Sequence, residues 1–177
     1  MLEIRTSSGL TALLLACGGG HIDTVSILLK AGALTNPSAQ EGGTPLMAAA
    51  QAGHLPIVMH LMEAGADIKE SMWDGANALF LTAQNGHSEV LRYLLEVPGI
   101  EVNQQRRDGA TPLWIAAQMG HHQCVRQLLA AGAEIDLARG DGATPLFKAC
   151  HKGHQEVARE FLRYKPMLGT LDVSWFI

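Results

Sequence analysis

The feature that most constrains the fold of this chain is a sequence pattern that returns about every 33 residues. Its clearest copy is DGATPLWIAAQMGH, at Asp108–His121. Each copy contains a lead glycine, and the steps between successive lead glycines are 33, 33, 34 and 33 residues for Gly9, Gly42, Gly75, Gly109 and Gly142. A fixed period of this length is typical of a stacked repeat array.

Each copy carries the signals of a short helix followed by a second helix. A residue with a side-chain oxygen stands where the first helix begins, and it can accept a hydrogen bond from the first turn. A proline follows it in three copies, and a glycine ends the helix about two turns later. A second apolar stripe at helical spacing comes next. The predicted N-cap residues are Thr11, Thr44, Asn77, Thr111 and Thr144.

A single repeat is too small to bury its own apolar face, so each repeat needs a neighbour. We therefore predict an all-α solenoid of about five helix-turn-helix repeats, with β-turn or hairpin tips along one edge. The predicted domain is 1–168, with repeats at about 7–39, 40–72, 73–106, 107–139 and 140–168. The third repeat has one extra residue in LLEVPGIEVN, which we interpret as a longer surface loop.

These residues resemble the ankyrin repeat, whose pattern is roughly G-x-T-P-L-H-x-A-A-x-x-G-H before a second helix that ends in L-L-x-x-G-A. The resemblance covers about nine-tenths of the chain. It implies an imidazole hydrogen bond between turns, but the slot of that histidine is filled by other side chains. We expect an apolar ladder between repeats there and prefer it to a ligand-binding aromatic box. The slot holds Leu14, Met47, Phe80, Trp114 and Phe147.

The last residues, 169–177, form an apolar tail that leaves the repeat register and ends in Trp175, Phe176 and Ile177. Three interpretations stay open. The array continues in a longer relative, the tail covers the last repeat, or a partner captures the free carboxylate with Trp175 and Ile177 as anchors.

Composition and charge exclude several classes of partner. The net charge of −4 does not favour nucleic acid, and no apolar run approaches the roughly 20 residues that span a membrane. The segment LTALLLACGGG resembles a secretory signal, but it lies on the repeat register and follows no basic region. Cys17, Cys124 and Cys150 lie in three different repeats, which favours reduced thiols. We expect an intracellular location, in the cytoplasm or alternatively the nucleus.

The histidines of the chain do not predict a metal site. Five of them occupy equivalent slots on helices that stack about 8–10 Å apart, whereas zinc ligands must lie about 2 Å from one ion. We interpret these histidines as polar side chains tied to the turn backbone. They are His21, His54, His87, His121 and His154.

Neither of the two shorter clusters of metal-ligand types includes a second pair of ligands. These clusters are Cys150, His151 and His154, and His121, His122 and Cys124. The sequence also lacks the nucleophile-elbow, phosphate-loop and dinucleotide patterns. We therefore expect no enzyme and no cofactor.

The resemblance places the binding surface on the concave face, which is made of the turn tips and the exposed ends of the first helices. Trp73, Arg107 and Met119 are of residue types enriched at interface hot spots. We favour solvated surface for the row of three glutamines at the helix ends. The tip positions are Gln40, Glu41, Trp73, Asp74, Arg107, Asp108 and Asp141. The helix-end positions are Gln51, Gln84, Asn85, Gln118, Met119, His151 and Lys152.

Asn103, with Leu95 eight residues before it, resembles the family's acceptor for asparagine hydroxylation. A plain turn-capping asparagine is the interpretation we favour. As a whole, the sequence predicts a monomeric, non-catalytic adaptor that binds an unidentified partner protein. The alternative is a structural segment or spacer of a longer ankyrin array.

Overall fold

Ten helices follow one another as five antiparallel pairs in the part of the chain that the structure describes. The structure is a computed structural model and describes residues 3–166. The pairs are α1 (Ala12–Gly18) with α2 (Ile22–Lys30), α3 (Pro45–Ala52) with α4 (Leu55–Glu63), α5 (Ala78–Asn85) with α6 (Ser88–Leu95), α7 (Pro112–Met119) with α8 (His122–Ala130), and α9 (Pro145–His151) with α10 (Gln155–Arg163). A short 3-10 turn, η1 (Gln40–Gly42), precedes α3. The predicted all-α solenoid is confirmed.

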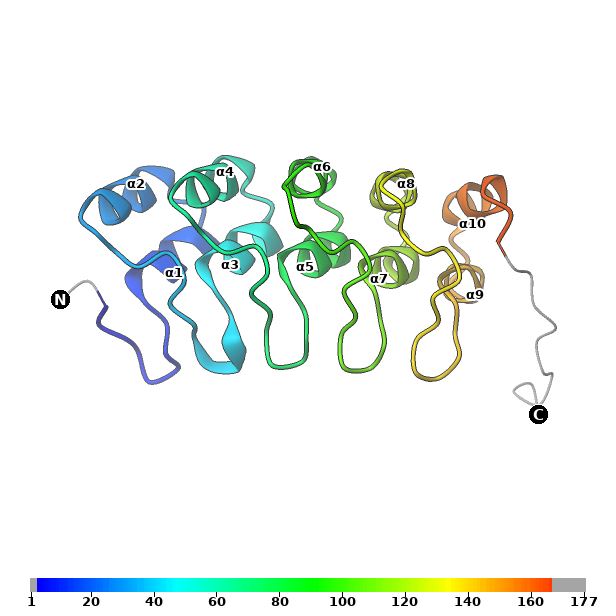
Figure 1. Ribbon diagram of the computed structural model, residues 1–177, viewed down its shortest axis with the longest axis horizontal. Coiled ribbons are helices and arrows are strands. Elements are labelled where there is room, and N and C mark those ends of the chain that lie inside the picture. Colours follow the sequence, from blue (N-terminus) through cyan, green and yellow to red (C-terminus); the bar gives the residue numbers. More distant parts are fainter. Residues whose placement is uncertain (1–2, 167–177) are drawn as a thin grey trace.

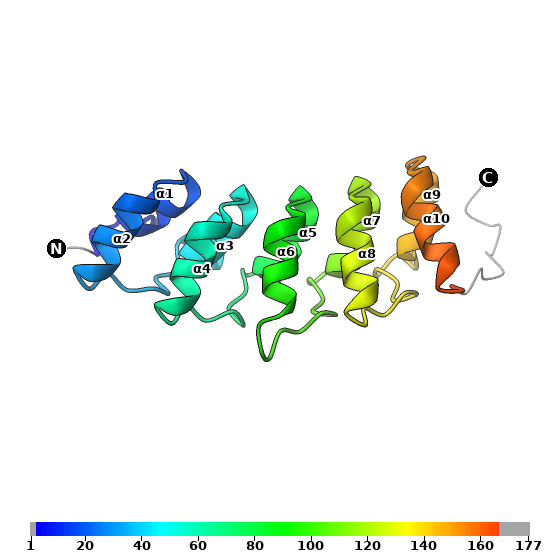
Figure 2. The same ribbon diagram turned by 90° about the horizontal axis from the view of Figure 1, so that it is seen from above.

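The pairs stack along one axis in two layers (Figures 1 and 2). In Figure 1 the first helices, α1, α3, α5, α7 and α9, form one row, and the second helices form another above it. The connecting tips project beyond the row of first helices. Neighbouring first helices pack more extensively than neighbouring second helices, because fully buried alanines such as Ala49, Ala83 and Ala116 allow close approach. The layer of first helices and tips is therefore the inner side of the stack.

Local signals fix where the first helices begin. The side chains of Thr11, Thr44, Thr111 and Thr144 each accept the N–H three residues later. Asn77 caps the first helix of the third pair in the same way, because its Oδ1 accepts the N–H of Phe80 at 2.9 Å. All five predicted N-caps are confirmed. Because the capping oxygen is covalently close to the helix it caps, this part of the fold depends on sequence neighbours alone.

The side chains that stand where the ankyrin pattern has a histidine form an apolar ladder inside the stack. Met47, Phe80 and Trp114 are almost completely buried, with 3%, 1% and 1% of their surface exposed. Leu14 and Phe147 are half-buried, because within residues 3–166 each has a neighbouring pair on one side only. The apolar ladder expected from the sequence is therefore present.

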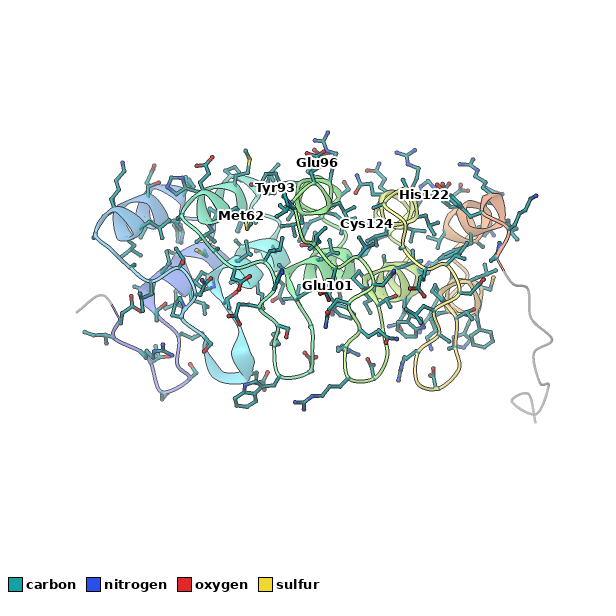
Figure 3. The ribbon with its side chains drawn as sticks, in the orientation of Figure 1. Met62, Tyr93, Glu96, Glu101, His122 and Cys124 are labelled. Carbon is teal, nitrogen blue, oxygen red and sulfur yellow. The ribbon has the colours of Figure 1, made fainter. Side chains whose placement is uncertain are left out.

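The outer layer carries the second helices and their own polar contacts. Figure 3 shows Met62 on α4, Tyr93 on α6 and His122 on α8 in this layer, on the side away from the tips. His122 Nε2 lies 3.4 Å from Oε2 of Glu160, which is buried on α10 and also accepts a hydrogen bond from Arg163 at 2.7 Å. These contacts tie α8 to α10.

The extra residue of the third repeat lies in the turn after α6, where Pro98 and Gly99 are exposed. Within residues 3–166, no helix is both long and apolar enough to cross a bilayer. The predicted tail at 169–177, including Trp175, Phe176 and Ile177, lies outside the described residues.

Candidate functional site

The tips are tight hairpin loops that hydrogen-bond to one another along the array. In the fourth tip, the N–H of Arg106 donates to the carbonyl of Ala110 at 2.9 Å, and that of Gly109 donates to Arg106 at 2.8 Å. The same two bonds recur in the other tips. Bonds between successive tips run from Trp73 N–H to the Glu41 carbonyl (2.8 Å), from Arg107 to Asp74 (2.7 Å), and from Gly140 to Asp108 (2.8 Å).

The second, third and fourth tips lie so close to the tip that follows each of them that a Cβ on Gly42, Gly75 or Gly109 would lie 2.9–3.2 Å from its backbone, whereas nothing lies within 4 Å of a Cβ on Gly142. At Gly109, where φ is +85°, a Cβ would lie 2.9 Å from the backbone nitrogen of Gly140 in the next tip. The lead glycine therefore serves two purposes, because it adopts a left-handed turn and admits the neighbouring backbone. The result is a continuous row of backbone that holds the tip side chains at fixed positions.

An aspartate closes three of the tips. Asp74, Asp108 and Asp141 each accept, through Oδ1, the backbone N–H two residues later at 3.0–3.2 Å. This short side-chain turn is a common use of aspartate in loops. The second tip has Glu41 in the same place, and its φ of 65° is in the left-handed region. The longer glutamate therefore sits in a conformation that its aspartate counterparts do not adopt.

Two arginines connect the aspartates into a ladder of ion pairs. Arg106 makes a bidentate contact with Asp108, at 3.0 and 2.6 Å, and reaches within 4.0 Å of Asp74. Arg139 lies 3.4 Å from Asp108 and 3.9 Å from Asp141. The hydrogen bond from Arg106 is the main reason that the pKa of Asp108 falls from 3.8 to about 2. Asp108 is thus held as a carboxylate between two guanidinium groups.

The same two arginines also lie over two aromatic rings of the apolar ladder inside the stack, those of Phe80 and Trp114. The guanidinium carbon of Arg106 lies 5.2 Å from the ring centre of Phe80, and that of Arg139 lies 5.1 Å from the ring of Trp114. Both distances are within the range of a cation–π interaction. Each arginine therefore joins a first helix to the tip of the following repeat.

The expectation that the slot makes only packing contacts was wrong at Trp114. Its indole Nε1–H donates to the carbonyl of Ala143 in the next tip at 2.8 Å, and the bond is buried. An indole has one N–H donor at the end of a large apolar ring. Trp114 therefore combines apolar packing with a hydrogen bond between repeats.

Three of the five equivalent histidines, His87, His121 and His154, bond to the preceding repeat and not to their own turn. Nε2 of His87 lies 2.9 Å from the carbonyl of Gln51, that of His121 lies 3.0 Å from Gln84, and that of His154 lies 2.9 Å from Gln118. Each ring thus caps the end of the first helix one repeat earlier. The interpretation as structural polar side chains is retained, but their partners lie about 36 residues away in sequence.

The row of glutamines at the helix ends is only partly solvated. Gln51 is exposed, whereas Gln84 and Gln118 are half-buried, and all three backbone carbonyls are used by the histidines. Beside this row, Asn85 is exposed but donates through Nδ2 to the carbonyl of Leu81 at 2.8 Å. These residues are therefore more constrained than the sequence suggested.

Further along the same face, three predicted contact residues at the helix ends of the fourth and fifth repeats are exposed. Met119 is 47% exposed, and His151 is exposed and stacks on Phe147 with ring centres 6.3 Å apart. Lys152 is exposed as well. The side chain of Gln40 lies outside what the structure describes. Of all the predicted contact residues, the most exposed large apolar side chain is Trp73, at 64%.

Trp73 lies in a hollow of about 290 Å³ that three neighbouring tips enclose. Glu41 comes from the second tip, Trp73 and Asp74 from the third, and Arg107 from the fourth, with Met72 at the base. The structure thus brings together four of the residues predicted at the tips. Asp108 and Asp141 belong to the ion-pair ladder, and Met119, His151 and Lys152 lie apart from the hollow.

Asn103, in the loop after α6, hydrogen-bonds to the loop after α8. Its Oδ1 accepts the backbone N–H of Glu134 at 2.9 Å, and its Nδ2 lies 3.4 Å from a carboxylate oxygen of the same residue. Asn36 makes the equivalent bond to Asp67 at 3.0 Å. The geometry supports the turn-capping interpretation of Asn103, and hydroxylation of this residue stays a prediction.

The thiols and histidines of the described chain do not gather at one point. Within residues 3–166, no group of three or more His, Cys, Asp or Glu side chains could hold a metal ion. Burial raises the pKa of Cys17 to about 12 and that of Cys124 to about 11, whereas Cys150 is exposed. A buried thiol of this kind behaves as a small apolar side chain.

Arg106 and Arg139 are the site residues that the sequence reasoning missed, although a signal for them exists. Phe80 is followed 26 positions later by Arg106, and Trp114 is followed 25 positions later by Arg139. The aliphatic slots differ, because Leu14 and Met47 are followed 25 positions later by Ala39 and Met72. The aromatic slots Phe80 and Trp114 are thus paired with arginine, and the aliphatic slots Leu14 and Met47 with an apolar residue.

Comparisons with known proteins agree with this architecture. A family model described as "Ankyrin repeats (3 copies)" matches residues 2–72 and 64–139, and one described as "Ankyrin repeat" matches residues 141–167. A search of curated proteins gave no match.

Proposed function

This chain belongs to the ankyrin repeat family, and from that premise we propose that it is a non-catalytic adaptor that binds a partner protein through its tips and first-helix ends. Ankyrin repeats are generally protein–protein interaction modules and are typically non-catalytic. The observation that carries the proposal is the exposed indole of Trp73 in the hollow between tips.

The physical support is that this tryptophan is exposed on a rigid surface. A large side chain left in water at a fixed position loses little conformational entropy on binding and buries a large apolar area. Trp and Arg are also the types that most often dominate interface energetics. The N–H groups of Trp73 and Arg107 donate to the carbonyls of Glu41 and Asp74, so the neighbouring tips hold the backbone of both residues before a partner arrives.

The test is affinity capture followed by mass spectrometry, with the wild-type chain and the double variant Trp73→Ala/Arg107→Ala as baits. We expect specific partners to be depleted about tenfold or more with the double variant, which corresponds to a loss of about 1.4 kcal/mol or more. Arg126→Ala is the matched control, because Arg126 is an exposed arginine on α8 in the outer layer. Circular dichroism checks that helicity is unchanged. Equal recovery with wild type and double variant contradicts the proposal.

A second candidate function is that of a structural segment in a longer array. It is favoured by an apolar hollow of about 420 Å³ beside α1 and α2, whose lining includes Ile4, Leu10, Leu15 and Leu28. Ile4 and Leu15 are more than half exposed, so a further repeat stacked there would bury them. This function predicts self-association of the isolated chain. A monomer in light scattering with one cooperative thermal transition contradicts it and agrees with the monomeric adaptor.

A further inference from the structure

The hollow around Trp73 is lined by three charged residues, and two of them, Glu41 and Arg107, are of opposite sign and come from the tips on either side of the tryptophan. The order along the array is fixed by backbone bonds, because Trp73 N–H donates to Glu41 and Arg107 N–H donates to Asp74. A Cβ on Gly42 would lie 3.4 Å from Cδ1 of Trp73, so the indole reaches over the second tip. Glu41 and Arg107 therefore lie on opposite sides of one exposed aromatic surface.

The charges in this region divide into those that have partners and those that do not. Asp74 accepts a hydrogen bond from Ala76 and lies near Arg106, and Asp108 is held between Arg106 and Arg139. The side chains of Glu41 and Arg107 make no hydrogen bond or ion pair with the rest of residues 3–166. Both are exposed. These two charges are available to an incoming molecule, whereas those of the ladder are committed.

The backbone at Glu41 adds an independent observation. Its φ of 65° and ψ of 7° place a residue with a side chain in the left-handed region, which is unfavourable for such a residue. An aspartate or asparagine would fit better there, since either can hydrogen-bond locally. Glutamate instead extends an unpaired carboxylate at the edge of the hollow. Outliers of this kind concentrate at binding sites.

We propose that this hollow binds an extended segment of the partner protein that carries one basic and one acidic residue. The basic side chain pairs with Glu41, the acidic side chain pairs with Arg107, and a residue between them lies on the indole of Trp73. This proposal rests on the proposed function and specifies its partner. Because the two charges differ in sign, they also set the direction in which the segment crosses the tips.

The spacing of the tips limits the length of the segment. The hydrogen bonds from Trp73 to Glu41 (2.8 Å) and from Arg107 to Asp74 (2.7 Å) keep the Cα atoms of Glu41 and Arg107 within roughly 17 Å of each other. An extended chain covers about 3.3–3.6 Å per residue. The basic and acidic residues are therefore expected within about six residues of each other, and fewer where the side chains of Glu41 and Arg107 reach inward.

The experiment is selection from a displayed library of random 12-residue peptides against the whole chain. We expect the enriched peptides to share a basic and an acidic residue in one order, on either side of an apolar or aromatic residue. The matched variant exchanges the two charges, Glu41→Arg with Arg107→Glu, and leaves the net charge and Trp73 unchanged. Selection on this variant is expected to enrich the opposite order.

Synthetic peptides then give affinities by fluorescence anisotropy. We expect Glu41→Gln and Arg107→Gln each to weaken the selected peptide about two- to fivefold, the size of an exposed ion pair. The charge-exchanged variant is expected to bind it about tenfold more weakly and to prefer the peptide whose two charged residues are interchanged. Enriched peptides without the charge pair, or an unchanged preference in the exchanged variant, would overturn the proposal.

The Trp73→Ala variant separates this proposal from the broader one. If the selected peptides depend on Trp73 but carry no ordered charge pair, the tip surface remains a binding site and only the proposed recognition of one basic and one acidic residue is contradicted. If the selected peptides bind Trp73→Ala as tightly as wild type, both the proposed binding surface and the proposed charge recognition are contradicted. Retention of dependence on Trp73, Glu41 and Arg107 together supports both.

Discussion

At the scale of single residues, Asp108 contributes most of the electrostatic connection between the tips. Its carboxylate accepts two hydrogen bonds from Arg106, contacts Arg139 and closes its own turn through the N–H of Ala110. Its side chain is 31% exposed, so solvent screens these interactions in part. Since Arg106 and Arg139 also lie over Phe80 and Trp114, the carboxylate fixes two cations on two aromatic rings.

Replacement of Asp108 by asparagine is expected to lower the free energy of unfolding by roughly 1 kcal/mol at pH 7. Asparagine keeps an oxygen for the N–H of Ala110 but loses the charge. Because the pKa of Asp108 in the folded chain is about 2 and its ordinary value is 3.8, its stabilising effect is complete above about pH 4 and disappears as the pH falls towards 2. Urea titrations at pH 7, 4 and 3 measure the difference between wild type and variant.

The matched control for this pH dependence is Asp141→Asn, which removes a carboxylate that closes the same kind of turn. Asp141 lies 3.9 Å from Arg139 and is 45% exposed, so its loss is expected to cost less than about 0.5 kcal/mol. A deficit for Asp108→Asn that is equally large at pH 7 and pH 3 would show that the charge is not the cause.

At the scale of elements, the sequence predicts what depends on neighbours in the chain and misses what depends on stacking. The caps at Thr11 and Asn77 could be predicted because each acts within three residues. The contact of Arg106 with Phe80 joins residues 26 positions apart, and that of His121 with Gln84 joins residues 37 apart. Such contacts depend on how two repeats are placed relative to each other in space. The length of the sequence repeat alone does not predict that placement.

The candidate site shows the same division. The residue types at the tips indicated Trp73 and Arg107 as contact residues, and the structure places both in one hollow. The role of Asp108 in the ladder could not be predicted in the same way, because its partner Arg139 comes from the following tip. The sequence alone does not distinguish the unpaired, exposed Arg107 from the paired, half-buried Arg106 next to it.

The close approach of the tips predicts different costs for two alanine substitutions at glycines with the same backbone conformation. Gly109 and Gly132 both have a φ of +85°, but a Cβ at Gly109 would lie 2.9 Å from Gly140 N, whereas nothing lies within 4 Å at Gly132. Gly132→Ala is expected to cost about 1 kcal/mol from the left-handed backbone. Gly109→Ala is expected to cost at least about 1 kcal/mol more, because the next tip must move.

Chemical denaturation of the two variants measures this difference, and binding of a selected peptide gives a second readout. Displacement of the fifth tip should leave the hollow around Trp73 intact, since its walls come from the second, third and fourth tips. Equal losses of stability at both glycines would mean that the tips adjust freely to one another.

At the scale of the whole molecule, the core is one continuous cluster that runs from Leu13 in α1 to Phe161 in α10, so stability is distributed along the length of the array. Each repeat contacts only its neighbours, and stability is close to a sum of repeat and interface terms. The interfaces differ in chemistry. The guanidinium groups of Arg106 and Arg139 lie over the rings of Phe80 and Trp114, and Trp114 also makes a buried hydrogen bond. For Leu14 and Met47, the corresponding positions are occupied by the apolar residues Ala39 and Met72.

This uneven distribution predicts an order of local unfolding that hydrogen exchange with mass spectrometry can measure. α5 and α7 each contain six buried residues, and α2 contains only Val25. The amides of α5 to α8 are therefore expected to exchange most slowly, and those of α1 and α2 fastest among the ten helices of residues 3–166. α9 and α10 should fall between them, because Val157 and Phe161 are buried and the ladder through Arg139 reaches the fifth tip. Asp108→Asn should speed exchange in α7 to α10 and leave α1 and α2 unchanged, since each interface acts on its neighbours. A single exchange rate for all ten helices of residues 3–166, raised uniformly by the variant, would instead mean that the stack unfolds as one cooperative unit.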